Sequence, residues 1–388
     1  MKSLFVAFIL LCTGIPLIAQ QSSPLLFSIE PTLSFGKVVK NSPVAPTSNV
    51  ALLSEFNIGI QTDGRKEWHH LYNFPKPSLL IALGGLGNKS VLGNFIGIAP
   101  NLTLNSLSTK WYSPKFALGL GVAYFSKPYN AESNTTNFYI GSSITALGYA
   151  SVYIQPDIHR QFSLKTGVSV IHCSNGHVQI PNLGINVPTV FFGFAYRPNP
   201  FPAKFEKKDI SMPESKLRFN VRLGMGVHEL ARTTEPVGTA KYAIYVTDFY
   251  VSKRFGKISN VHAGVEINHY NSYYQYIVRN NFFTSNQWQK ATVVTLFLGH
   301  EFMMGHLSLL SQGGINVYNP FYNEYIKMYK SERGSKTELK KYISTRLGLQ
   351  YYFWDPKYCT RSNIFVGAYI KANFGQADFI CSQIGFVF

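Results

Sequence analysis

The sequence predicts an all-β protein, an antiparallel transmembrane barrel of the outer-membrane type with roughly 16 strands. The first reason is the composition. The chain has 388 residues, of which only 14% are charged and 15% are aromatic, and Gly (31) and Phe (30) are abundant. A soluble domain would lack charges to cover its surface, and a disordered chain would be less apolar. Beyond the N-terminus, no apolar run has the roughly 18 residues of a membrane-spanning helix, so a closed barrel is expected instead.

Residues 1–19 are predicted to be a secretory signal peptide. Lys2 precedes an apolar run from Leu4 to Leu11, and a small residue, Ala19, ends the segment. This order of positive charge, apolar stretch and small residue is typical of such signals. We therefore expect the mature chain to begin near Gln20.

Side chains that alternate with a period of two also indicate membrane-spanning strands. Between Phe116 and Tyr124, bulky apolar residues alternate with Ala and Gly. A strand in a soluble sandwich would carry polar residues on its outer face, so a bulky face beside a small, uncharged one indicates a strand between lipid and a crowded lumen. The last strand repeats the pattern, with Ile384 and the terminal Phe388 on one face and Gln383 on the other. An alternating final strand that ends in Phe resembles the signal read by the barrel-assembly machinery, which we expect as a partner.

Eight strands are predicted in each half of the chain. They span approximately 25–37, 49–61, 77–84, 93–106, 115–125, 138–158, 161–174 and 185–197, then 216–228, 239–253, 259–274, 288–300, 306–318, 342–353, 363–374 and 378–388.

A polar linker, residues 199–215, separates a first barrel region (24–198) from the C-terminal strands (216–388). It is rich in Pro and Lys and lacks the strand pattern. The sequence leaves two arrangements possible. Sixteen strands can form one wide barrel with a water-filled lumen, or two small barrels with packed lumens.

The formal net charge of +17 has two interpretations. Basic residues could simply line loops and membrane interfaces, or they could contact the phosphates of a lipid leaflet that contains lipopolysaccharide. No basic run or basic helix supports nucleic acid as a partner. We expect location in the cell outer membrane.

The segment from Gly167 to Asn186 carries the candidate chemistry. Phe162, Leu164, Val168 and Val170 would share the lipid-facing side of one strand, and the same parity places His172 and Ser174 there. On the next strand Asn186 is in phase with an outward apolar face. Polar groups facing hydrocarbon are costly unless they have partners, so these three residues require an explanation.

His172 and Ser174 are candidates for nucleophilic catalysis. A neutral imidazole that takes the serine proton activates the hydroxyl for acyl transfer. The loop between the strands contains Gly176 and Asn182, which could offer N–H donors to an oxyanion or bind substrate. The alternative is structural, because a strand that emerges into the head-group region commonly ends in His or Ser.

The run His172-x-Ser174-Asn175, followed by Pro181-Asn182-x-Gly184-Ile185, resembles the active-site signature of the lipid A 3-O-deacylase (acyloxyacyl hydrolase) family of outer-membrane barrels. The upstream segment Ile140–Ser143 resembles that family as well, and the likeness covers approximately residues 24–198. It implies an eight-stranded barrel that removes the 3-linked acyl chain of lipid A, with His172 as general base, Ser174 as nucleophile and Asn175 contributing to the oxyanion site. It implies no metal and no organic cofactor.

The sequence departs from this family at one position, because the triad glutamate falls at Asn186. An amide can orient an imidazole but cannot stabilise the imidazolium by charge, and in a serine protease the acid-to-amide change costs about 10⁴-fold in rate. Asp157 and Glu132 are candidate replacement carboxylates on chain proximity alone.

Two function classes therefore compete. The first is a carboxylic ester hydrolase acting on lipid A in the outer leaflet, and the second is an outer-membrane channel or scaffold with a degenerate deacylase site. The complete signature favours the hydrolase, whereas Asn186 and the additional strands favour the channel or scaffold.

Overall fold

The structure is a computed structural model that describes residues 26–106, 112–199, 208–230, 239–328, 335–359 and 361–388. The predicted signal peptide (1–19) and linker residues 200–207 lie outside the described residues. Within the described ranges, no helix combines the length and the apolar character needed to span a bilayer.

The chain folds into two closed, eight-stranded antiparallel barrels. In the first, the strands are β1 (Phe27–Lys37), β2 (Val50–Ile60), β3 (Lys76–Gly85), β4 (Asn94–Asn105), β5 (Lys115–Phe125), β6 (Ile144–Ile154), β7 (Phe162–Ser174) and β8 (Ile185–Tyr196). In the second, they are β9 (Leu217–Glu229), β10 (Lys241–Phe255), β11 (Ser259–Tyr270), β12 (Thr292–Met304), β13 (Leu307–Tyr318), β14 (Ile343–Tyr352), β15 (Asn363–Asn373) and β16 (Gln376–Val387).

Pairing of the first and last strand closes each barrel. Phe35 of β1 lies opposite Val190 of β8, and Leu223 of β9 lies opposite Ile384 of β16. The prediction of a transmembrane barrel fold with about 16 strands is confirmed. Of the two arrangements that the sequence allows, the chain adopts two small barrels. The predicted strand at 138–158 starts too early, because Tyr139 and Ile140 are buried in the loop before β6.

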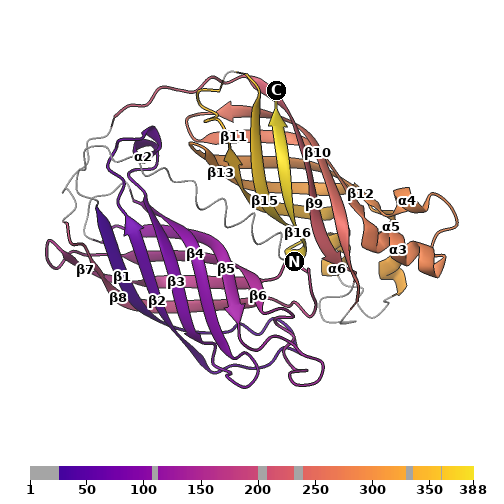
Figure 1. Ribbon diagram of the computed structural model, residues 1–388, viewed down its shortest axis with the longest axis horizontal. Helices are drawn as coiled ribbons and strands as arrows, with labels where there is room; N and C mark the ends of the chain where they lie inside the picture. Colours follow the sequence, from indigo (N-terminus) through magenta and orange to yellow (C-terminus); the bar gives the residue numbers. More distant parts are fainter. Residues whose placement is uncertain (1–25, 107–111, 200–207, 231–238, 329–334, 360) are drawn as a thin grey trace.

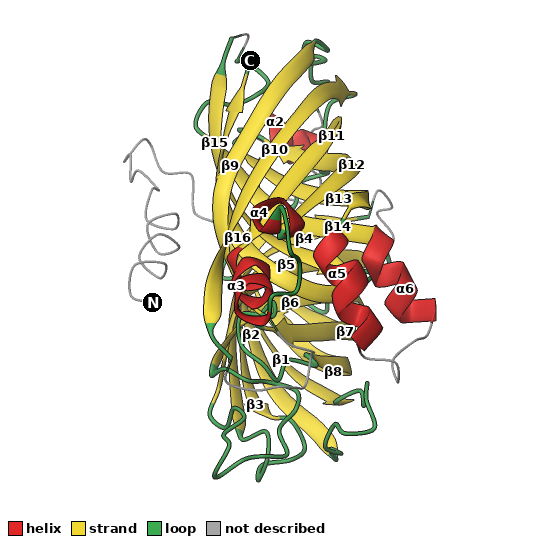
Figure 2. Ribbon diagram, turned by 90° about the vertical axis from the view of Figure 1, so that its right-hand side faces the viewer, coloured by secondary structure: helices red, strands yellow, loops and turns green. Residues whose placement is uncertain are grey.

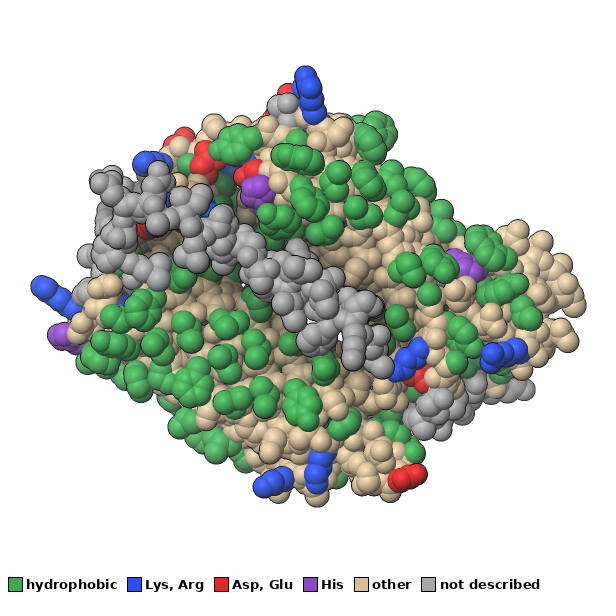
Figure 3. Space-filling model, in the orientation of Figure 1, with side chains coloured by type: hydrophobic (Ala, Val, Ile, Leu, Met, Phe, Trp, Pro, Cys, Tyr) green, Lys and Arg blue, Asp and Glu red, His purple; other side chains and the backbone are tan. Residues whose placement is uncertain are grey.

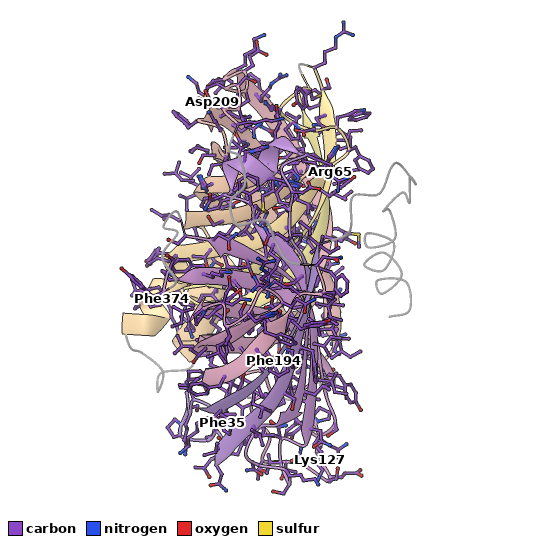
Figure 4. The ribbon with its side chains drawn as sticks, turned by 90° about the vertical axis from the view of Figure 1, so that its left-hand side faces the viewer. Phe35, Arg65, Lys127, Phe194, Asp209 and Phe374 are labelled. Atoms are coloured by element: carbon purple, nitrogen blue, oxygen red, sulfur yellow. The ribbon has the colours of Figure 1, made fainter. Side chains whose placement is uncertain are left out.

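Bulky apolar side chains cover the outer walls. The alternate residues predicted to face lipid on β7 are exposed, for example Val168 (54%), and so are Phe35 and Phe194, labelled in Figure 4. On β16, Ile384 faces outward while Cys381 and Gln383 are buried, as its alternation predicts. Figure 3 shows hydrophobic side chains over both barrels. A lipid-facing wall explains such exposure, which water would penalise.

Side chains fill both lumens. In the first barrel, Glu30 is buried between Lys76 and Lys165, with Lys165 Nζ 2.9 Å from Glu30 Oε2. In the second, an ion-pair network joins Asp248 to Arg222 and Arg346 and joins Glu266 to Arg346 and Lys371. Buried charges in this setting require such partners. The barrels therefore enclose packed polar cores.

The two barrels lie side by side with their strands in similar directions (Figure 1). Helix α2 (Glu67–Leu71) and the C-terminus lie at one end, and the helices α3 (Asn271–Asn280), α4 (Gln287–Lys290), α5 (Pro320–Tyr325) and α6 (Ser335–Tyr342) lie at the other (Figures 1 and 2). A short 3₁₀ helix, η1 (Ile326–Met328), follows α5. The longer loops gather at the end with α3–α6, which in outer-membrane barrels is the extracellular end. We call it the outer rim.

Candidate active site

The candidate site lies at the outer rim of the first barrel, where β7 ends and β8 begins. The connection, residues 175–184, is called the site loop. Because β7 and β8 are paired in register up to Cys173 and Ile185, their last residues bring the site side chains together.

His172 and Asn186 are directly opposite each other across the β7–β8 ladder. His172 Nδ1 lies 2.8 Å from Asn186 Oδ1, and His172 is exposed on the outer wall. When Nδ1 carries the proton, it donates to the amide oxygen and Nε2 keeps its lone pair. Asn186 can therefore hold the imidazole in the tautomer that a general base needs.

Two glycines leave space around the imidazole. Gly148 of β6 is the other cross-strand neighbour of His172. Gly184, at φ +71°, ends the site loop, and a methyl group there would lie 3.4 Å from His172 Cε1 and 3.8 Å from Ser174 Cβ. His172 and Ser174 thus border the same glycine, on the same side of β7.

Ser174 is only 5% exposed, although its parity predicts an outward position at the lipid face. It is the final residue of β7, and the site loop folds over it. Its Oγ accepts hydrogen bonds from Gly176 N (3.2 Å) and Asn182 Nδ2 (3.0 Å). No hydrogen bond joins His172 to Ser174 among the described side chains. Catalysis would need the hydroxyl to turn from the site loop to the imidazole.

Gly176 and Asn182, two of the residues predicted to serve an oxyanion, thus converge on the Ser174 hydroxyl. Asn175, the third, is directed elsewhere, since its Nδ2 donates to Gln179 O (2.5 Å) and Ser142 Oγ (3.2 Å). Its backbone N–H donates to Asn182 Oδ1 at 3.2 Å. Asn175 therefore organises the site loop, and the upstream Ser142 contacts it directly.

Neither candidate replacement carboxylate is placed to assist His172. The Asp157 carboxylate is paired with Arg197 and accepts a hydrogen bond from Ser163 (2.6 Å) near the start of β7. Burial opposes ionisation of Asp157, but these partners lower its pKa overall. At about 3.3 Å per residue, His172 lies roughly 30 Å further along the strand. Glu132 is exposed in the loop between β5 and β6, and no contact with His172 is described.

The second barrel also contributes to the site, which sequence reasoning missed. Glu229 of β9 accepts a hydrogen bond from the backbone N–H of Ile180 in the site loop, at 2.9 Å. No local signal could reveal this contact, because it joins residues far apart in the chain and depends on how the barrels sit together. In the part of the chain that the structure describes, no cluster of three or more His, Cys, Asp or Glu side chains is arranged to hold a metal ion.

Two family models match the chain. Residues 55–195 match the lipid A 3-O-deacylase (PagL) model, and residues 217–388 match the model of the acyloxyacyl hydrolase C-terminal domain. The resemblance that the signature predicts is therefore confirmed. A comparison with curated proteins found no match.

Among solved structures, two similar to this chain are the following. The outer membrane enzyme PagL is 18% identical, with 42% of this chain and 97% of that chain covered and a TM-score of 0.30. Pseudomonas aeruginosa OccK5 (OpdH) is 10% identical, with 94% of this chain and 97% of that chain covered and a TM-score of 0.21.

Proposed function

Since residues 55–195 belong to the lipid A 3-O-deacylase family and the chain is an outer-membrane barrel protein, we propose that it is a carboxylic ester hydrolase that removes the 3-linked acyl chain of lipid A. The observation that carries this proposal is the pairing of His172 with Asn186, at 2.8 Å, beside a serine on the same side of β7. The outer rim is the end of the barrel that we expect to meet the head groups of the outer leaflet, where an ester of lipid A would be within reach of this pair.

In the proposed reaction, lipid A lies against the outer wall and its ester carbonyl approaches Ser174. The hydroxyl turns from Asn182 to His172, and Nε2 accepts its proton as Oγ bonds to the carbonyl carbon. The tetrahedral intermediate collapses and breaks the bond to the sugar oxygen, which leaves as a hydroxyl by taking the proton from Nε2. Water, deprotonated by the same imidazole, then attacks the acyl-enzyme, and the departing Ser174 oxygen recovers that proton as the fatty acid leaves.

Gly176 N–H and Asn182 Nδ2 are the proposed oxyanion donors. They lie 3.2 and 3.0 Å from Ser174 Oγ and are fixed by the site loop. Preorganised donors of this kind stabilise the negative oxygen of the intermediate, and the loss of one typically costs about 10²–10³-fold in rate. Asn186 replaces the acid of the family triad, so we expect turnover to be slow but measurable.

A conducting channel is the less supported alternative. Eight-stranded barrels enclose a lumen just wide enough for side chains, and here Glu30, Lys165 and the Asp248 network occupy the two interiors. Lipopolysaccharide in the outer leaflet is the partner that we propose from the family, and the barrel-assembly machinery is the partner that we propose from the closed-barrel fold.

The test is mass spectrometry of lipid A after incubation with purified, detergent-folded protein. The native protein should release one 3-linked hydroxyacyl chain, and Ser174→Ala should release none. Ser311→Ala is the matched control, because Ser311 is exposed on the outer wall of the second barrel. Unchanged lipid A from folded native protein would instead support a scaffold with a silent site.

A further inference from the structure

The site loop is held against the second barrel. Among the residues that the structure describes, His177, Gln179 and Ile180 of the loop contact that barrel, and Gly176 lies so close to Ile380 of β16 that an added Cβ would clash with it. His177, Gln179 and Ile180 lie between the two proposed oxyanion donors, Gly176 and Asn182, along the chain. Any displacement of this segment would therefore move Gly176 relative to Ser174.

Glu229, the last residue of β9, makes the central contact. It is 1% exposed, and its Oε2 accepts the hydrogen bond from Ile180 N at 2.9 Å. Its Oε1 accepts a hydrogen bond from Thr239 Oγ1 at 2.8 Å, which fixes the orientation of the carboxylate. The backbone N–H of Glu229 donates to His177 O at 3.5 Å. One residue of the second barrel thus engages the site loop at two points.

His177 packs against a cluster of three rings in the second barrel, those of His228, Tyr270 and Tyr273, which we call the platform. Its ring stacks on that of His228, with centroids 5.8 Å apart and an interplanar angle of 19°. His228 Nδ1 lies 2.7 Å from Ser272 Oγ, and Tyr270 and Tyr273 pack edge-on against the same ring. The platform therefore cannot move without repacking of the second barrel.

The backbone of the site loop is strained where it meets this platform. Gly176 has φ +63° and His177 has φ +65°, a conformation that a residue other than glycine rarely adopts. A methyl group on Gly176 would lie 2.3 Å from Ile380 Cγ1 of β16. Strain at a non-glycine residue such as His177 persists only where surrounding contacts impose it. His177 is held by the His228 ring and the Glu229 N–H of the second barrel and, within the loop, by the Asn175 side chain, whose Oδ1 accepts a hydrogen bond from His177 N at 3.1 Å.

We propose that the second barrel is a positioning element of the deacylase site, and that Glu229 is the residue through which it acts. By fixing Ile180 and the segment before it, Glu229 holds the site loop in the conformation that aims Gly176 N–H and Asn182 Nδ2 at Ser174 Oγ. This inference rests on the proposed function. Glu229 is not a catalytic residue, because it touches neither Ser174 nor His172.

The experiment compares Glu229→Met with Glu229→Gln. Met removes the acceptor for Ile180 N–H at similar volume, whereas the Gln side chain retains one amide oxygen. We expect Glu229→Met to lower kcat for release of the 3-linked acyl chain about 10- to 100-fold, the cost of misplacing catalytic groups by about 1 Å. KM should change little, because the lipid-facing wall is intact. Glu229→Gln should restore most of kcat.

Glu301→Met is the matched control for general damage to the second barrel. Glu301 is equally buried in the same barrel, where its Oε2 accepts a hydrogen bond from Tyr352 Oη at 2.9 Å. If Glu301→Met lowers kcat as much as Glu229→Met does, the effect is not specific to the site loop and the proposal is wrong.

Amide hydrogen exchange supplies a readout that needs no activity. In Glu229→Met, amides of residues 175–182 should exchange faster while those of β7 remain protected; native exchange across the loop would overturn the proposal. If the native protein is inactive but its loop amides respond in this way, the proposed deacylase function is wrong and the role of Glu229 in holding the site loop is supported. If the native protein is active and Glu229→Met has native kcat and native exchange, only the proposed role of Glu229 is wrong.

Discussion

His172 Nδ1 faces Asn186 Oδ1 at 2.8 Å across the β7–β8 ladder, at the position where the family resemblance leads us to expect a carboxylate. The imidazole is thus oriented by a neutral partner. The geometry of a base–orienter pair is present without the charge that would stabilise the imidazolium. A negatively charged partner at position 186 is therefore expected to increase the reaction rate.

Asn186→Glu should accelerate the reaction. A carboxylate beside Nδ1 would stabilise the protonated imidazole during acyl transfer, and the gain is bounded by the roughly 10⁴-fold loss that the reverse change causes in a serine protease. The measurement is the initial rate of 3-linked acyl release. Asn186→Leu should be slower than native protein, because it leaves the ring without an acceptor. Equal rates for all three proteins would contradict a role for residue 186.

Gly184→Ala should impair catalysis without unfolding the barrel. The added methyl group would lie 3.4 Å from His172 Cε1, and φ +71° disfavours any residue with a Cβ. The contact with the ring is of ordinary length, so we expect the backbone strain at φ +71° to shift the end of the site loop beside His172 and Ser174 and to lower kcat about 10- to 100-fold. The rate is measured together with a check of folding, the difference in gel mobility between heated and unheated samples. Gly313→Ala is the control, since nothing lies near its added methyl group.

Glu30→Gln should destabilise the first barrel strongly. Glu30 is the shared carboxylate for Lys76 and Lys165, and its neutralisation would leave two ammonium groups buried without their counter-charge. Breaking a buried ion pair in this way typically costs about 3–5 kcal/mol of unfolding free energy. The urea midpoint of the folded protein measures the loss. Exposed Glu132→Gln should stay within about 0.5 kcal/mol of native; a similar midpoint for both variants would argue against the lumen ion pairs.

The protein should not conduct ions. Because both eight-stranded barrels have filled lumens, planar bilayers that contain folded protein should show no steady current above the bare-bilayer level. Conductance recordings over a range of voltages test this. Stable, ohmic current steps would mean that a lumen opens, and they would revive the channel interpretation.

The sequence by itself determined which residues face lipid. Strand side chains alternate with a period of two, so the exposed positions of Val168 and Phe194 and the buried position of Gln383 follow from parity alone. The same parity, with the family signature, located His172 and its cross-strand partner Asn186. These are local properties, carried by a few consecutive residues on each strand.

Only the tertiary structure decided how the strands close and what covers Ser174. The same alternation suits one wide barrel or two small ones, because closure depends on pairs such as Phe35 with Val190, which are distant in the chain. Ser174 has the parity of an outward residue, yet the site loop buries it. The carboxylate that holds this loop, Glu229, comes from the other barrel. Periodicity predicts the face on which a side chain lies, whereas the contacts made there depend on segments that only the folded chain brings together.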